Sequence, residues 1–277
     1  MPGELDFLVA TSSGCAPDPF HYLLVANQGT TPLAFATGQV SISPGALAPL
    51  GPVTSFGTFT FSLSGLADPI RTVRARRGAL AGGGHGVWGL AAEGTSPPPS
   101  SQTLGVAYPP GFGEGARAEI VVGDGSSRFQ RLRVDVPMAE ATLSIDVSNM
   151  LLPWIRIADP EQLVETTAWA YDGGGAADGA IFQVVYEKPN SAGELVEWVS
   201  IAPAGTTHVR FPRLPADLAA LTPAVGQLRS SADGYLVESP AVTSYAQFRA
   251  TAGERMRHGG DLPSDTAPER VSGVSGR

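Results

Sequence analysis

Apolar and polar residues alternate along many short stretches of the chain. The clearest stretches are rich in β-branched and aromatic residues and predict strands over 20–26, 58–64, 131–136, 141–147, 180–187, 197–202 and 208–211. In the second of these, Phe59, Phe61 and Leu63 fall on one face, with threonines and serines on the other. A strand of this kind has one face on a core and one in water, which is typical of antiparallel sheets.

Turn and helix signals support an all-β fold. Clusters such as 172–179 and 188–194 supply the glycines and polar residues that tight turns favour. The stretch 94–103, rich in proline and serine, is expected to be a surface loop because proline lacks a backbone donor. A connector helix is predicted over 214–221, where the apolar pattern lasts for about two turns.

A chain of 277 residues is longer than a typical single domain, which suggests one large or two smaller domains. A change of pattern after the stretch LLPWIRI places the boundary near residue 157. We therefore expect two tandem antiparallel, immunoglobulin-like β-sandwich domains over 1–157 and 158–250. Residues 251–277 contain few apolar positions and no periodicity, so they are expected to form a disordered tail that cannot offset its ordering entropy.

Composition narrows the classes of partner. The chain has 26 acidic and 18 basic residues and a net charge of −8, which repels a nucleic-acid backbone. Charged residues make up 16%, below the roughly 25% that is usual, so the surface is expected to be rich in Ser, Thr and Gly. Such a surface favours packing against copies of itself in a homo-oligomer. No apolar run approaches the roughly twenty residues of a transmembrane helix.

Cys15 is the only cysteine, so the chain cannot form an intramolecular disulfide. Its context, SSGC, partly matches a bacterial lipoprotein cleavage site. However, Ser12 stands where a leucine is expected and the apolar stretch before it is short. We interpret Cys15 as an ordinary thiol.

A basic stretch runs into a glycine-rich loop at residues 74–89, RARRGALAGGGHGVWG. Arg74 and Arg76 alternate with apolar residues and are predicted to lie on the outer face of a strand. No Gly-Lys-Ser/Thr follows and no helix pattern offers an anion-binding N-terminus, so the loop lacks the features of a phosphate site. We interpret it as a hairpin connector in which His85 has no chemical role.

The same alternation in RFQRLRVDV places two more arginines on an outer face. If the two strands are neighbours, they form a patch of Arg74, Arg76, Arg131 and Arg133. As a binding site, this patch would suit an acidic glycan, a phosphorylated lipid head group or an acidic protein partner. We favour the alternative, a solvated sheet face whose charge is balanced by Asp135 and Glu119.

Two further groups of residues have a functional and a structural interpretation. Asp172 and Asp178 are oxygen ligands of the kind that calcium prefers, but two carboxylates are too few and a hairpin explains the adjacent glycines. Trp154, Trp169 and Trp198 could form a carbohydrate platform on the surface. Tryptophans in strands are more often buried, which is what we expect here.

Common catalytic signatures are missing from the sequence. It has no Gly-x-Ser-x-Gly elbow, no His-Glu-x-x-His zinc pair and no cysteine pair, so no catalytic residue, metal ligand or cofactor is predicted. A secreted hydrolase with a dispersed site is the alternative. It would require His21, His85 or His208 within hydrogen-bonding reach of both a carboxylate and a serine; the alternation predicts that His208 points to solvent.

The stretches 57–66, 128–148 and 197–221 resemble uncharacterised secreted or lipoprotein-like β-proteins of myxobacteria and similar high-GC bacteria. The resemblance implies a prealbumin-like or carboxypeptidase-regulatory-like sandwich and brings no catalytic residue with it. The chain departs from that group at its start, which does not match an export signal well. We expect a non-enzymatic protein, extracellular or in the cell envelope, that acts as a binding module or a structural, self-assembling subunit.

Overall fold

The computed structural model describes a fold made mostly of strands. The described residues are 5–8, 20–28, 31–40, 53–81, 85–89, 91–112, 115–158, 161–173, 175–189, 191, 193–209, 211, 214–256 and 269–276. Among them, no helix is long and apolar enough to cross a membrane.

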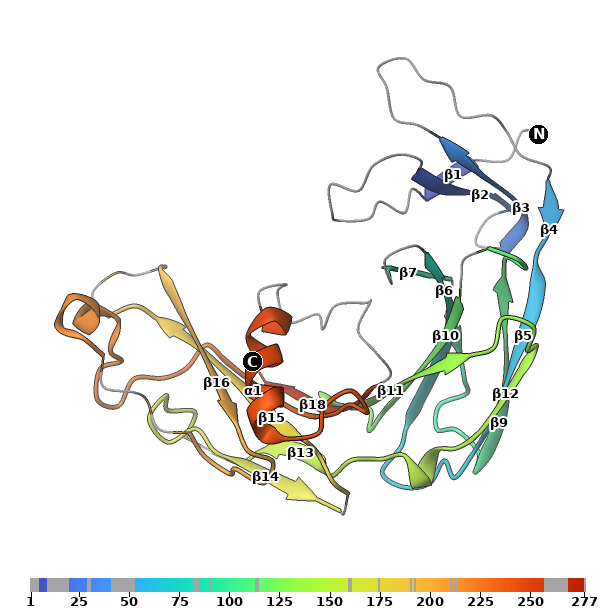
Figure 1. Ribbon diagram of the computed structural model, residues 1–277. Helices are drawn as coiled ribbons and strands as arrows, with labels where there is room; N and C mark the ends of the chain where they lie inside the picture. The colour runs from blue at the N-terminus through green and yellow to red at the C-terminus, as the bar shows by residue number, and fades with distance from the viewer. Residues whose placement is uncertain are drawn as a thin grey trace.

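One large antiparallel sheet curves through the molecule (Figure 1). Its path is β16 (Leu195–Ala202), β15 (Gly179–Glu187), β17 (Ser231–Glu238), β18 (Glu269–Gly276), β11 (Arg128–Val136), β10 (Gly115–Gly123), β6 (Thr72–Ala81) and β7 (His85–Trp88), with β8 (Ala92–Glu93) also paired to β6. Strand β18 pairs with β17 on one side and β11 on the other. The last strand of the chain therefore joins the two halves of the sheet.

Smaller elements pack around the large sheet. A three-stranded sheet contains β12 (Thr142–Asp146), β5 (Gly57–Ser64) and β9 (Ser101–Tyr108), and a two-stranded sheet contains β13 (Trp154–Ile157) and β14 (Trp169–Asp172). Near the N-terminus, β1 (Leu5–Leu8), β2 (Phe20–Gln28), β3 (Thr31–Val40) and β4 (Thr54–Ser55) form a further sheet. The helices are η1 (Val147–Asn149), η2 (Ala216–Leu221) and α1 (Tyr245–Met256).

The first core lies between the three-stranded sheet and the β6–β10–β11 part of the large sheet. Phe59, Phe61 and Leu63 of β5 are buried, which confirms the face predicted from the alternation in 58–64. Val73 of β6 and Ile120 of β10 meet them from the large sheet. This half of the molecule therefore has two packed layers of sheet. Strand β12 runs parallel to β5, an exception to the expected antiparallel pairing.

The second core lies under β13 and β14, which cover one face of β15, β17 and β18. The rings of Trp169 and Phe182 stack with centroids 4.2 Å apart. A side chain at Gly234 would place its Cβ 2.7 Å from the Trp169 ring, so the close approach of the two layers requires glycine there.

Helix α1 covers the opposite face of the same strands. Its Phe248 and Ala252 are fully buried against Ile181, Val237 and Val271. Strands β15, β17 and β18 are thus covered on both faces, by α1 and by the β13–β14 pair.

The expectation of a disordered tail over 251–277 is wrong for the residues that the structure describes. Residues up to 256 continue α1, and residues 269–276 form β18 in the middle of the large sheet. The reason is that β18 gains its burial from neighbouring strands. Phe129 and Tyr235 lie over Gly273, and Ile157 lies over Gly276, so small residues are well packed although the strand has few apolar ones.

Other sequence predictions are confirmed only in part. The large sheet runs through both sides of residue 157, and two separate tandem sandwiches are not confirmed. The predicted loop 94–103 ends earlier because residues 101–103 begin β9. The predicted connector helix is η2, a 3₁₀ helix. Of the strand predicted over 208–211, the described residues form a single β-bridge, between His208 and Ala168.

Removing residues 269–277 should strongly destabilise the protein. Without β18, strands β17 and β11 would each lose a row of backbone hydrogen bonds and a buried neighbour. Thermal unfolding followed by circular dichroism should show a large fall in midpoint or loss of the cooperative transition. Removal of Arg277 alone is the control and should have no effect; an unchanged midpoint in the longer truncation would contradict the fold.

Phe61→Ala should lower the free energy of unfolding by about 3–5 kcal/mol because it leaves a cavity between two sheets. Thr60→Ala, one position along the same strand, should cost less than about 1 kcal/mol. Denaturant unfolding measures both values. The reverse order of effects would show that the strand presents its other face to the core.

Candidate functional site

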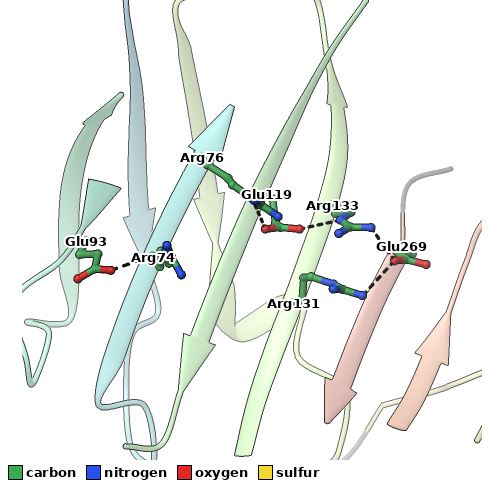
Figure 2. A network of polar contacts seen from close by, with 7 residues as sticks. All are labelled: Arg74, Arg76, Glu93, Glu119, Arg131, Arg133 and Glu269. Carbon is green, nitrogen blue, oxygen red and sulfur yellow. Dashed lines mark hydrogen bonds and ion pairs between the residues drawn. The ribbon is translucent and has the colours of Figure 1, made fainter. Parts of the chain in front are cut away.

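The four predicted arginines lie on one face of the large sheet (Figure 2). Arg74 and Arg76 come from β6, and Arg131 and Arg133 come from β11. Strand β10 separates β6 from β11 and pairs with both. The two strands are therefore not direct neighbours, but the structure brings their arginines to the same region.

Alternating charges cross four strands of this face in one row. Arg76 lies opposite Glu119, Glu119 opposite Arg133, and Arg133 opposite Glu269. The Glu119 oxygens lie 2.6 Å from Arg76 Nε and 2.7 Å from Arg133 Nε. Glu269 Oε1 lies 3.3 Å from Arg133 Nη1 and 3.4 Å from Arg131 Nη2. We call these five residues the charged row.

The centre of the charged row is buried, so the expectation of a solvated face is wrong there. The Arg133 side chain is 3% exposed, and Glu119 and Glu269 are buried with it. Glu119 does balance the arginines, as the sequence suggested. Sequence alternation could not show that β10, β11 and β18 are interior strands, whose side chains are shielded by neighbours on both sides. Arginine and glutamate are retained at such positions when they pair with each other.

The charge state of Glu119 is set by two opposing effects. Burial favours the neutral acid and by itself would raise the pKa of Glu119. The hydrogen bonds and positive charges of Arg76 and Arg133 outweigh burial and hold the pKa below its ordinary value of 4.5. Glu119 is therefore ionised at neutral pH, and the charged row is a set of ion pairs.

Arg74 differs from the other three arginines. Its side chain is 62% exposed, and its Nε lies 3.7 Å from Glu93 of β8, itself exposed. An ion pair in this setting contributes little to stability because both groups stay hydrated. Of the four predicted arginines, Arg74 is therefore the one whose charge is most accessible to a ligand.

Arg74 lines a shallow groove of about 460 Å³ at the end of β6, β10 and β11. Its lining includes Glu93, Ser96, Ser126, Ser127 and Phe129. Phe129 supplies an aromatic wall, and its ring is held over Gly273 of β18. The groove combines two arginines, of which Arg128 is paired with Asp124 and Asp172, with a carboxylate, hydroxyl groups and an apolar ring.

The turn at the end of the groove has a fixed geometry. Asp124 accepts hydrogen bonds from Ser126 N at 2.9 Å, Ser126 Oγ at 2.7 Å and Arg128 Nε at 2.5 Å. Burial would raise the pKa of Asp124, but these bonds and the Arg128 charge hold it below its ordinary value. On the other side, Ser96 Oγ donates to the Arg71 carbonyl at 2.9 Å. Both serine hydroxyls donate to the protein, which leaves their oxygen lone pairs to accept from a ligand.

The two aspartates considered for calcium have structural partners. Asp172 pairs with Arg128 at 3.2 Å and Arg156 at 3.6 Å, and Asp178 accepts a hydrogen bond from Ser239 N at 2.8 Å. No group of three or more His, Cys, Asp or Glu that could hold a metal ion occurs in the described part of the chain.

The tryptophans do not form a surface platform. Trp154 and Trp169 are buried, as predicted, in the first and second cores. Trp198 is half-buried, and its ring packs on Phe211 with centroids 4.6 Å apart.

The hydrolase alternative stays a prediction, because only one of its three candidate histidines has a described side chain. His208 is exposed, as expected, and its Nδ1 lies 2.9 Å from the hydroxyl of Thr207. The side chains of His21 and His85 lie outside the described residues. The predicted hairpin around the glycine-rich loop is confirmed, because β6 and β7 pair antiparallel with Ala81 opposite His85.

Three residues of this face were not predicted from the sequence: Phe129, Glu93 and Glu269. Phe129 is two positions from Arg131, so the same alternation could have placed it beside the arginines. Glu93 lies in β8, a strand of two residues that is too short to show a periodic pattern. Glu269 was assigned to the tail because the stretch ERVSGVSG has only two apolar residues.

The chain matches no protein-family model, no curated protein and no solved structure. The resemblance of 57–66, 128–148 and 197–221 to secreted β-proteins therefore stays a prediction, as does localisation outside the cytoplasm.

Glu119→Gln should lower the free energy of unfolding by about 3–5 kcal/mol, because it removes the charge between two arginines at a buried position. Glu93→Gln makes the same change at an exposed pair and should cost less than about 1 kcal/mol. Denaturant unfolding at neutral pH compares the two. Equal small losses would show that the charged row does not support the fold.

Acid should reduce the difference in free energy of unfolding between wild type and Glu119→Gln. The folded-state pKa of Glu119 is lowered, so its contribution is present above the ordinary value of 4.5 and is lost as the pH falls through the folded-state pKa. Unfolding curves between neutral pH and pH values below 4.5 measure this trend. A difference that stays constant would show that Glu119 is not an ionised partner in the fold.

Proposed function

We propose that the protein is a non-enzymatic binding protein of the extracellular space or the cell envelope, and that it binds a glycan in the groove beside Arg74. The observation that carries this proposal is the combination of groups in the groove. Arg74 can donate hydrogen bonds, Glu93 and the serine oxygens can accept them, and Phe129 offers an apolar surface. Sugars present hydroxyl groups of both kinds together with apolar C–H faces.

Charge favours a neutral or weakly acidic glycan over a phosphorylated lipid head group. Glu119 and Glu269 already pair with Arg76, Arg131 and Arg133. A highly charged phosphate at the groove would meet Arg74 but would also approach Glu93, while the charge of Arg128, the other arginine of the lining, is already paired with Asp124 and Asp172. The net charge of −8 adds a long-range repulsion for polyanions such as nucleic acid.

The proposal is tested with Arg74→Ser. A glycan array with wild-type protein identifies a bound sugar, and titration calorimetry then compares variants. Arg74→Ser should weaken binding by about tenfold or more, the loss expected for a hydrogen bond from a charged group. Arg249→Ser is the matched control, because Arg249 is also an exposed arginine but lies on α1 and does not line the groove.

Two results would contradict the proposal. One is a wild-type protein that binds no glycan on the array. The other is a bound glycan whose affinity falls equally in Arg74→Ser and Arg249→Ser, which would place the glycan elsewhere or show a nonspecific charge effect.

A further inference from the structure

The large sheet ends at β16, at the far end from β6 (Figure 1). β16 pairs with β15 along its whole length in unbroken antiparallel register, from Leu195 opposite Glu187 to Ala202 opposite Ala180. Within the described part of the chain, no strand pairs with its other side. An open edge of this kind presents a row of backbone donors and acceptors.

The hydrogen bond at the start of β16 shows which residues face outward. Lys188 N donates to the Glu194 carbonyl at 2.7 Å, so this pair is a hydrogen-bonded pair. Such pairs alternate along an antiparallel ladder, and even-numbered residues of β16 therefore bond to β15. The backbone groups of Leu195, Glu197 and Val199 point away from β15.

The outer edge of β16 has a hydrogen-bonding partner near the C-terminal end of the strand. Ile201 belongs to the same outward-facing set, and its carbonyl accepts a hydrogen bond from Tyr245 Oη at 3.1 Å. This contact from the start of α1 agrees with the alternation. It leaves the stretch from Leu195 to Val199 open for pairing.

The side chains of β16 do not protect this edge. The sequence LVEWVSIA contains one charged residue, Glu197, and has no lysine or proline. Proteins commonly use such residues, bulges or short strands to prevent edge pairing. At the other end of the sheet, β7 has only four residues.

One apolar side chain lies at the open edge itself. Leu195, the first residue of β16, is 63% exposed. Burial of this side chain would stabilise any strand pairing at the edge.

We propose that β16 pairs antiparallel with β16 of a second copy of this chain, which continues the large sheet across a two-fold axis. The strand is self-complementary in this arrangement. In the register that sets Glu197 opposite Val199 of the second copy, both central hydrogen-bonded pairs lie within the open stretch, and no two carboxylates face each other. A strand of eight residues makes a small interface, so the dimer should form reversibly with concentration.

A second copy fits this edge better than an unrelated peptide. β16 is partly covered on both faces, because Val199 and Ile201 pack against the cluster that contains Phe248 of α1, and Trp198 packs on Phe211. A two-fold related copy brings the same two layers to the junction and can extend both cores. A single extended peptide brings no such layers and would leave the exposed Leu195 largely in water.

Sedimentation equilibrium of the full chain over a concentration series tests this proposal. Wild type should shift from 28.6 kDa toward twice that mass as concentration rises. Val199→Pro should stay monomeric, because its missing N–H points outward and the bonds to β15 are retained. Leu195→Lys should also stay monomeric, since it places a charge on the exposed edge without altering the core.

Leu218→Lys is the matched control, an equal change at an exposed leucine of η2, and should dimerise like wild type. Circular dichroism confirms that each variant is folded. A wild type that stays at 28.6 kDa throughout, or a dimer that persists in both edge variants, would overturn the proposal. Glycan binding by Val199→Pro is measured alongside; dimerisation and the groove are independent, so either can fail without the other.

Discussion

Strand β18 is hydrogen-bonded on one side to β17 and on the other to β11, and this double pairing makes one sheet out of two groups of strands. The first group packs against β5, β9 and β12, and the second against α1 and the β13–β14 pair. Each group is assembled from residues that precede β18 in the chain. The arrangement of the two groups relative to each other therefore depends on β18.

The same strand completes the charge balance of the sheet. Glu269, its first residue, is the partner of Arg131 and Arg133, while Glu119 holds Arg133 and Arg76. With these pairs formed, most of the arginine charge that the sequence displays supports the fold. What remains for a ligand is Arg74, at the edge of a groove whose aromatic wall, Phe129, is also positioned over β18. Fold and proposed binding site thus share one structural support.

The alternation of apolar and polar residues predicted the side-chain directions within single strands. It placed Phe59, Phe61 and Leu63 in the core and the four arginines on an opposite face, because side-chain direction in a strand follows from residue parity. It could not predict what depends on neighbours. The burial of Arg133, the covering of Gly273 by two aromatic rings and the central place of β18 come from strands distant in the sequence. Two valines in eight residues gave no sign of that environment.

The fold depends most on β18 being an integral strand, and hydrogen exchange measured by mass spectrometry on the intact protein tests this directly. Amides of 270–275 are paired on both sides by β17 and β11, so they should exchange as slowly as those of β10 and β15. Rapid exchange of 270–275, at the rate of an unfolded peptide while β10 and β15 remain protected, would contradict the central role of β18.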